Sequence, residues 1–190
     1  DTLSIGSAIP FNTYNSVSTE QKTSWNSIIN TKFNSKFSWR TGIIADLIQT
    51  NYDEKLLNSD NVWQSITNFN GKSSLIQAYT QVRYKPSEKI TINPGVHYQL
   101  FTLNNDQIIE PRLSVKYDIT EKQSIHLAGG LHSQMHPLRV YLLESHYLDG
   151  TSAKTNLDLG FTKSIHAVLG YKHTLARNFN LRVEAYYQSL

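Results

Sequence analysis

Apolar and polar side chains alternate with a period of two along much of this chain. In residues 179–190, Leu181 and Val183 share one face and Arg182 lies on the other. Residues 123–135 follow the same pattern, with leucines opposed to histidines. Successive side chains of a β-strand point to opposite faces, so this alternation predicts strands with one apolar and one polar face.

The same pattern predicts nine strands along the chain. Their expected bounds are residues 2–14, 23–33, 37–52, 74–84, 90–103, 108–118, 123–135, 164–175 and 179–190. Four of the connections are tight turns, centred near Asn34, Pro86, Glu121 and Arg177. The others are longer or less regular, and comprise residues 15–22, 53–73, 104–106 and 136–163. A short helix is expected near residues 61–67.

Tight and long connections alternate along the chain, and this order indicates the topology. In an up-and-down sheet, alternate connections lie at opposite ends, so all the tight turns should lie together. Short turns at one end and long loops at the other are typical of outer-membrane β-barrels. We therefore expect an all-β, antiparallel up-and-down meander of about nine strands. Residues 1–190 would form a single unit, part of an outer-membrane β-barrel.

A soluble β-sandwich is the alternative fold. Charged residues lie in mid-strand on the faces opposite the apolar ones, which a sandwich would expose to solvent; they are Arg40, Asp46, Arg83, Arg112, Lys116, Arg182 and Glu184. Such a module could bind carbohydrate through surface Tyr and Trp. Aromatic residues beside the tight turns favour the barrel, because aromatic girdles mark its interfaces with the membrane; they are Phe33, Phe37, Tyr84, Tyr117 and Phe179.

Composition agrees with strands that have one wet side. Hydrophobic residues make up 39% of the chain and charged residues only 17%. The absence of cysteine excludes disulfides and thiolate metal sites, and a net charge of +3 does not indicate nucleic acid. The N-terminal residues do not resemble a signal peptide, and the sequence holds no apolar run of about 18 residues that would predict a transmembrane helix.

No catalytic constellation stands out. The chain has seven histidines, but His126 and His132 would lie roughly 20 Å apart along a strand. A bend at residues 135–137 could bring His132 close to His136, although hydrogen bonding is the simpler role for both. The sequence contains no Gly-rich phosphate loop and no Ser nucleophile elbow. We expect no metal site, no cofactor and no enzymatic activity.

Several motifs resemble a known family. They are HLAGGLHSQ at residues 126–134, FTKS at 161–164, VLGY at 168–171, VEAYYQ at 183–188, and EPRLS at 110–114. Together with Pro137-Leu138 and Val140-Tyr141, they are similar to the barrel region of TonB-dependent outer-membrane receptors of the kind abundant in Bacteroidetes. The resemblance covers about the last eighty residues, whereas the first hundred match only in pattern and turn placement.

The resemblance implies a barrel of roughly 22 strands in the outer membrane of a Gram-negative bacterium. An N-terminal plug domain would connect it to the TonB system, and the receptor would import a scarce ligand. This chain shows no plug, too few strands and no terminal aromatic residue, so we expect a fragment from the interior of the barrel. Its open edge strands would pair with each other or, more favourably, with another copy.

Ligand contact is expected at the long connection, residues 136–163, and beside it. Loops on a rigid scaffold carry recognition, so the candidate ligand residues are His132, Gln134, Arg139 and Tyr141. Imidazole, amide, guanidinium and aromatic groups suit an oligosaccharide, a peptide or a metal chelate. The alternative is that Leu138, Leu142 and their neighbours only pack the connection against the barrel rim, and for Arg139 and Tyr141 both interpretations remain open.

Overall fold

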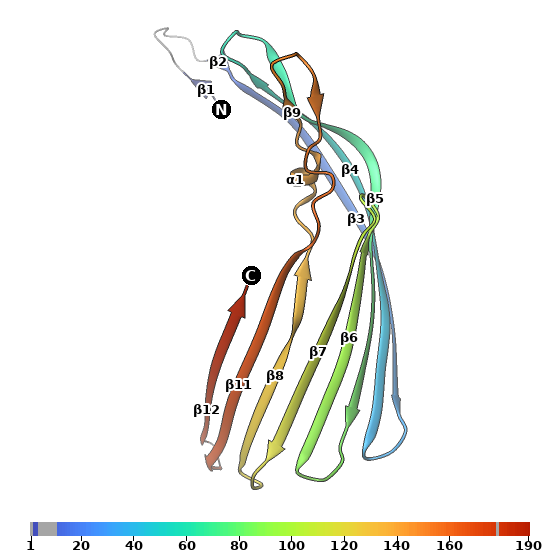
Figure 1. Ribbon diagram of the computed structural model, residues 1–190, viewed down its shortest axis with the longest axis vertical. Coiled ribbons are helices and arrows are strands. Elements are labelled where there is room, and N and C mark those ends of the chain that lie inside the picture. The colour runs from blue at the N-terminus through green and yellow to red at the C-terminus, as the bar shows by residue number, and fades with distance from the viewer. Residues whose placement is uncertain (1, 4–10, 178) are drawn as a thin grey trace.

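Eight strands form one antiparallel sheet in the computed structural model, which describes residues 2–3, 11–177 and 179–190 (Figure 1). The strands are β3 (Tyr14–Lys32), β4 (Phe37–Leu57), β5 (Trp63–Tyr84), β6 (Ile90–Phe101), β7 (Asp106–Asp118), β8 (Gln123–Gln134), β11 (Thr162–Ala176) and β12 (Phe179–Ser189). Each strand pairs with its neighbour in this sequence order, and every pairing is antiparallel. The predicted all-β up-and-down meander is confirmed.

Smaller elements complete the described chain. Two short ladders join β1 (Thr2–Leu3) to β2 (Phe11–Asn12), and β9 (Ser145–His146) to β10 (Ser152–Ala153). A short helix, α1 (Leu138–Leu142), follows β8. The strand expected over residues 2–14 lies largely outside the described residues. No helix in the described part of the chain is long and apolar enough to cross a membrane.

Two of the predicted connections are wrong, because most of their residues form β-strands in the structure. Residues 15–22 belong to β3 and pair with the upper part of β4. Residues 53–73 form the tip of the β4–β5 hairpin, and β-strand replaces most of the helix expected at 61–67. Apolar residues are few in these strand ends and do not alternate with a period of two, so the pattern does not mark them in the sequence. Backbone pairing with the neighbouring strand, which leaves no periodic signal, holds them in the sheet.

The four tight turns lie together at one end of the sheet, as predicted (Figure 1). Short polar side chains form two of them. The Asn34 side-chain oxygen accepts hydrogen bonds from the amides of Lys36 and Phe37, both at 2.8 Å. The Thr120 hydroxyl accepts in the same way from the amides of Lys122 and Gln123. These side chains mimic a backbone turn, which explains why the chain reverses within a few residues.

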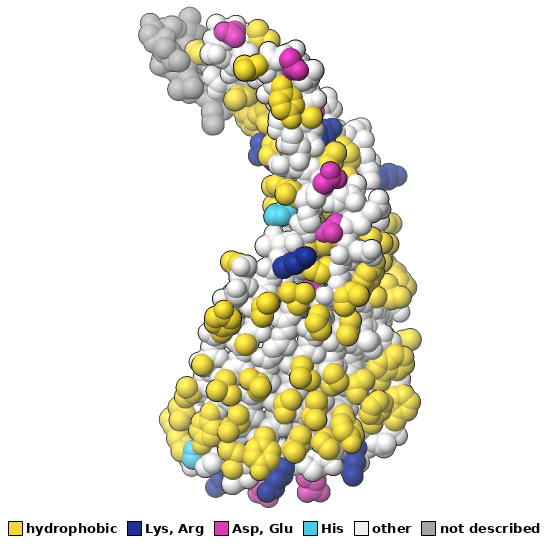
Figure 2. All heavy atoms as spheres, in the orientation of Figure 1, with side chains coloured by type: hydrophobic (Ala, Val, Ile, Leu, Met, Phe, Trp, Pro, Cys, Tyr) yellow, Lys and Arg dark blue, Asp and Glu magenta, His cyan; other side chains and the backbone are white. Residues whose placement is uncertain are grey.

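One face of the sheet, here called the apolar face, carries exposed hydrophobic side chains on every strand (Figure 2). Strand by strand, examples are Trp25, Ile43, Ile76, Val96, Leu113, Leu127, Leu169 and Val183. The register places these residues on the same side of the sheet. From the tight turns up to the level of Leu47, the described strand positions on this face include one charged residue, the exposed Lys163 near the upper end of β11.

The apolar face has a definite upper limit. On β4 its hydrophobic positions run from Phe37 to Leu47, after which Gln49 follows on the same face. Leu47 pairs with Thr23 and Ser74, so the change to polar residues occurs at one level on three strands. The apolar stretch is roughly 33 Å long, or about 25 Å tall after a strand tilt of about 40°. That height matches the apolar band of outer-membrane barrels.

The sandwich alternative requires a second sheet against the apolar face, and the described residues provide none. Trp25, for example, is 59% exposed. The eight-stranded sheet is also open, because no ladder joins β3 to β12 within the described chain. Closure by direct contact of the end strands is therefore not observed. Pairing between two copies stays a prediction.

A glycine allows one cross-strand contact near the C-terminal edge. His126, Gly170 and Glu184 are register partners on β8, β11 and β12. The His126 ring lies over Gly170, and its Nε2 is 2.9 Å from Oε1 of Glu184. A Cβ atom on residue 170 would lie 2.0 Å from the imidazole ring. Glycine is required here so that the imidazole can reach across a whole strand.

We expect Gly170→Ala to displace the His126 ring and lower the free energy of unfolding by about 1–3 kcal/mol. Urea unfolding in detergent would measure this cost. The matched control is Gly129→Ala, where the new Cβ meets only the His166 carbonyl oxygen, at 3.3 Å. Combining Gly170→Ala with His126→Ala should recover most of the loss. Equal costs for the two glycine variants would contradict this account.

Candidate functional site

The opposite face of the sheet, here called the polar face, carries the predicted mid-strand charges. Most of them form ion pairs with neighbours. Arg112 lies 2.6 Å from Glu110, Arg182 lies 2.6 Å from Glu184, and Asp46 lies 2.7 Å from Lys22. The sheet thus separates an apolar face, with a single charge at Lys163 below the level of Leu47, from a face that carries charges along its strands.

A proline interrupts the backbone ladder between β7 and β8. The pairing of β7 with β8 ends at Arg112 and Gly130, and the next residue toward the start of β7 is Pro111. Proline has no amide hydrogen to donate, so it weakens a ladder inside a sheet. Above this point the two strands are joined by side chains instead.

Glu110 provides that connection. Its side chain is fully buried and accepts hydrogen bonds from Gln99 Nε2 at 2.9 Å, Arg112 Nη2 at 2.6 Å and the Ser133 hydroxyl. His97 Nδ1 lies 2.6 Å from the same carboxylate. Gln99 also donates to the Ser133 backbone oxygen, at 3.2 Å. A buried carboxylate is stable only when its oxygens are paired in this way.

Two imidazole rings lie in tilted contact on the polar face near the C-terminal edge. The ring centroids of His132 and His166 are 4.5 Å apart. Both nitrogens of His166 have partners: the Ser164 hydroxyl at 2.8 Å and the Tyr186 hydroxyl at 3.2 Å. His132 and His166 line a shallow depression of about 280 Å³, together with Arg112. Of the described residues, no group of three or more His, Cys, Asp or Glu could hold a metal ion.

The long connection between β8 and β11 packs against the upper part of the sheet. Its apolar side chains join those of β4, β6 and β7 in the buried core of the protein, which contains Ile48, Tyr52, Phe101, Ile108, Leu138, Tyr141, Leu142 and Phe161. Packing against the wall is therefore the observed role of Leu138 and Leu142. The side chains on α1 lie at i, i+3 and i+4, the spacing of one helical face.

Polar contacts hold the same connection to neighbouring strands. The Glu144 amide donates to the Ile66 carbonyl at 2.8 Å, and Lys154 Nζ donates to the Asn68 carbonyl at 2.7 Å. From the β6–β7 turn, the Asn104 side chain donates to carbonyl oxygens of residues 157 and 159. These contacts make the connection a fixed part of the structure.

The four predicted ligand residues occupy different environments. Tyr141 is 1% exposed, packs against the Phe101 ring at a tilt with the ring centroids 5.2 Å apart, and accepts a hydrogen bond from the amide of residue 136. Burial raises the pKa of Tyr141. Arg139 Nε lies 2.8 Å from Oε2 of the buried Glu54. His132 contacts the His166 ring on the polar face, and Gln134 is exposed at the end of β8. Ligand contact by these residues stays a prediction.

Two buried acids were missed by sequence reasoning. Glu110 precedes a proline inside a predicted central strand, and this unusual placement could have indicated a broken ladder. Glu54 carried no signal, because its segment was expected to be a loop. It lies on β4, where the Arg139 guanidinium and the Ser16 hydroxyl contact it.

Comparison with known proteins identifies the fold. No family model matches the sequence, and no curated protein matches it. Among solved structures, the siderophore receptor PirA from Acinetobacter baumannii matches with a TM-score of 0.66 at 11% identity, over 90% of this chain and 27% of that chain. A mutant of the ferric enterobactin receptor PfeA from Pseudomonas aeruginosa matches with a TM-score of 0.64 at 12% identity, over 89% and 26%.

The outer membrane transporter YddB from Escherichia coli also matches, with a TM-score of 0.56 at 14% identity, over 92% of this chain and 25% of that chain. The chain therefore spans about a quarter of the length of these structures. Its fold is that of a segment of an outer-membrane receptor or transporter barrel.

The environment of Tyr141 predicts a structural role for its ring. Tyr141→Ala should open a cavity in the core and lower the free energy of unfolding by about 3–5 kcal/mol. Tyr141→Phe keeps the ring and loses one hydrogen bond, so it should cost about 1 kcal/mol. Chemical denaturation of both variants in detergent would check this order. A negligible cost for Tyr141→Ala would show that the ring does not support the connection.

Proposed function

We propose that this chain forms part of the barrel wall of a TonB-dependent outer-membrane receptor, which takes up a scarce ligand. The observation that carries the proposal is the apolar face, about 25 Å tall and charged only at Lys163 near its upper limit, on a sheet whose other face is charged along the strands. The tight turns at one end of the sheet and the long β4–β5 hairpin at the other match the short turns and long loops of outer-membrane barrels. The fold shared with two receptors and a transporter adds to this support.

The rest of such a receptor accounts for the open edges. Eight strands make about a third of a barrel of roughly 22 strands. Further strands would continue the ladder at β3 and β12, and lipid would cover the apolar face. A plug domain beside the polar face would connect the receptor to the TonB system. The sequence motifs near the C-terminus favour the type abundant in Bacteroidetes.

The ligand is a small molecule such as a metal chelate, an oligosaccharide or a peptide. Two of the structural neighbours are receptors for a siderophore and for ferric enterobactin, which favours a ferric chelate. His132, Gln134 and Arg139 stay candidates for ligand contact, because their side chains are partly or wholly exposed. Tyr141 would support the site from the core without touching the ligand.

A pair of adjacent substitutions tests the proposal. Leu169 lies on the apolar face, and its neighbour Val168 lies on the polar face. A lysine in place of a lipid-facing residue at the middle of the membrane costs about 2–4 kcal/mol. Leu169→Lys should therefore sharply reduce the fraction of protein that folds into phosphatidylcholine vesicles, whereas Val168→Lys should not.

Protease protection of the vesicle-bound protein would give the folded fraction for each variant. The unmodified protein and Val168→Lys serve as the reference and the control. Equal folding of both lysine variants, or a larger loss with Val168→Lys, would argue against lipid on the apolar face.

A further inference from the structure

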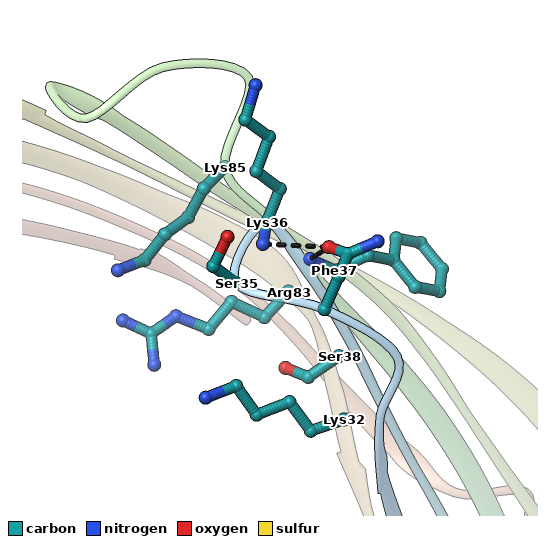
Figure 3. Close-up of a pocket in the computed structure, with 8 residues that line it drawn as sticks. Lys32, Ser35, Lys36, Phe37, Ser38, Arg83 and Lys85 are labelled. Atoms are coloured by element: carbon teal, nitrogen blue, oxygen red, sulfur yellow. Dashed lines mark hydrogen bonds between the residues drawn. The ribbon is translucent and has the colours of Figure 1, made fainter.

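Four cationic residues line one pocket at the tight-turn end of the polar face; they are Lys32, Lys36, Arg83 and Lys85 (Figure 3). Lys32, Ser38 and Arg83 are register partners on β3, β4 and β5, so they share this face. Lys85 lies two residues after Arg83, at the start of the turn between β5 and β6. Its amide donates to the Lys36 carbonyl at 2.7 Å. That bond fixes the two turns beside each other. The pocket has a volume of about 200 Å³.

The side chains converge on one space. In Figure 3, the ends of Lys32, Arg83 and Lys85 extend to the same side of the sheet, while Lys36 points away. The hydroxyls of Ser35 and Ser38 lie among them. In the described part of the chain, neither hydroxyl has a hydrogen-bond partner, so both are available as donors.

These cations differ from most others on the polar face, because no acid neutralises them. Arg112, Arg182 and Lys116 each form an ion pair with a carboxylate at 2.6 or 2.7 Å. Within the described residues, none of the four cations of the pocket forms an ion pair, and no acidic residue lines it. Glu88, in the same turn as Lys85, is not among the lining residues.

We propose that this pocket binds a phosphate group, through Lys32, Arg83 and Lys85 with help from the two serine hydroxyls. Like charges on neighbouring strands repel each other, and a bound anion removes this cost. A single carboxylate would leave most of the charge unbalanced, whereas a phosphate carries more charge and more acceptor oxygens. The planar guanidinium of Arg83 suits bidentate contact with phosphate oxygens.

The phosphate group could belong to a lipid headgroup at the membrane surface or to a soluble phosphate compound inside the barrel. Both sources offer the same chemistry to the pocket. The inference depends only on the contacts of β3, β4 and β5, and it does not depend on the identity of the imported ligand.

Calorimetric titration of the full chain with pyrophosphate tests the site. The protein would be held in an amine oxide detergent, which contains no phosphate, at about 50 mM salt to limit screening. We expect saturable binding that Arg83→Gln and Lys85→Gln each weaken about tenfold, the loss of one charge-assisted hydrogen bond. The matched control is Lys89→Gln, which removes the same charge from the same turn outside the pocket, and it should change the affinity less than about twofold.

Circular dichroism would verify that each variant keeps its strand content, and the use of two pocket variants protects the test against misfolding of one. Repeating the titration with phosphatidylglycerol in the micelles distinguishes the sources. Competition by the lipid assigns the pocket to a headgroup, and its absence assigns it to a soluble phosphate. No saturable binding by the unmodified chain, or equal weakening by Lys89→Gln, would overturn the proposal.

Discussion

The separation of an apolar face from a charged face is the constraint that governs the whole structure: in the proposed barrel wall one face lies in lipid and the other in water, so the charges at the middle of the wall must lie on the polar face. The period of two satisfies it on all eight strands, from Trp25 on β3 to Val183 on β12. Backbone groups cannot turn to water at the lipid face, so each strand must also pair along its length. The height of the apolar face and the backbone pairing of neighbouring strands together explain why the sheet is a meander with tight turns at one end.

Where the ladder is interrupted or a contact must cross a strand, side chains on the polar face maintain the wall. Glu110 joins β7 to β8 beside Pro111, and His126 crosses Gly170 to reach Glu184. The connection between β8 and β11 adds a small core centred on Tyr141. The polar face therefore provides both internal stability and a charged surface, while the apolar face adds hydrogen bonds between neutral side chains, such as that from Trp39 Nε1 to the Thr80 hydroxyl at 2.7 Å.

The parts of the fold that follow from periodicity were predictable, and the rest were not. Alternation located most strands, and Asn34 and Pro86 marked turns through side-chain chemistry. Alternation failed for the first half of β3 and the tip of the β4–β5 hairpin, because the few apolar residues there do not recur with a period of two. The partners of Tyr141 and Arg139 could not be predicted either, because they lie on strands far away in sequence. A single sequence carries no signal for such contacts.

The central claim, that the two faces of the sheet lie in lipid and in water, can be measured directly on β4. The chain contains no cysteine, so single cysteines at positions 43 to 46 can each carry a nitroxide label without other changes. In lipid vesicles, labels at Ile43 and Ala45 should contact oxygen dissolved in the bilayer, and labels at Ile44 and Asp46 should contact a water-soluble nickel complex. Alternation with a period of two is the expected result, and uniform contact with the nickel complex at all four positions would contradict the account.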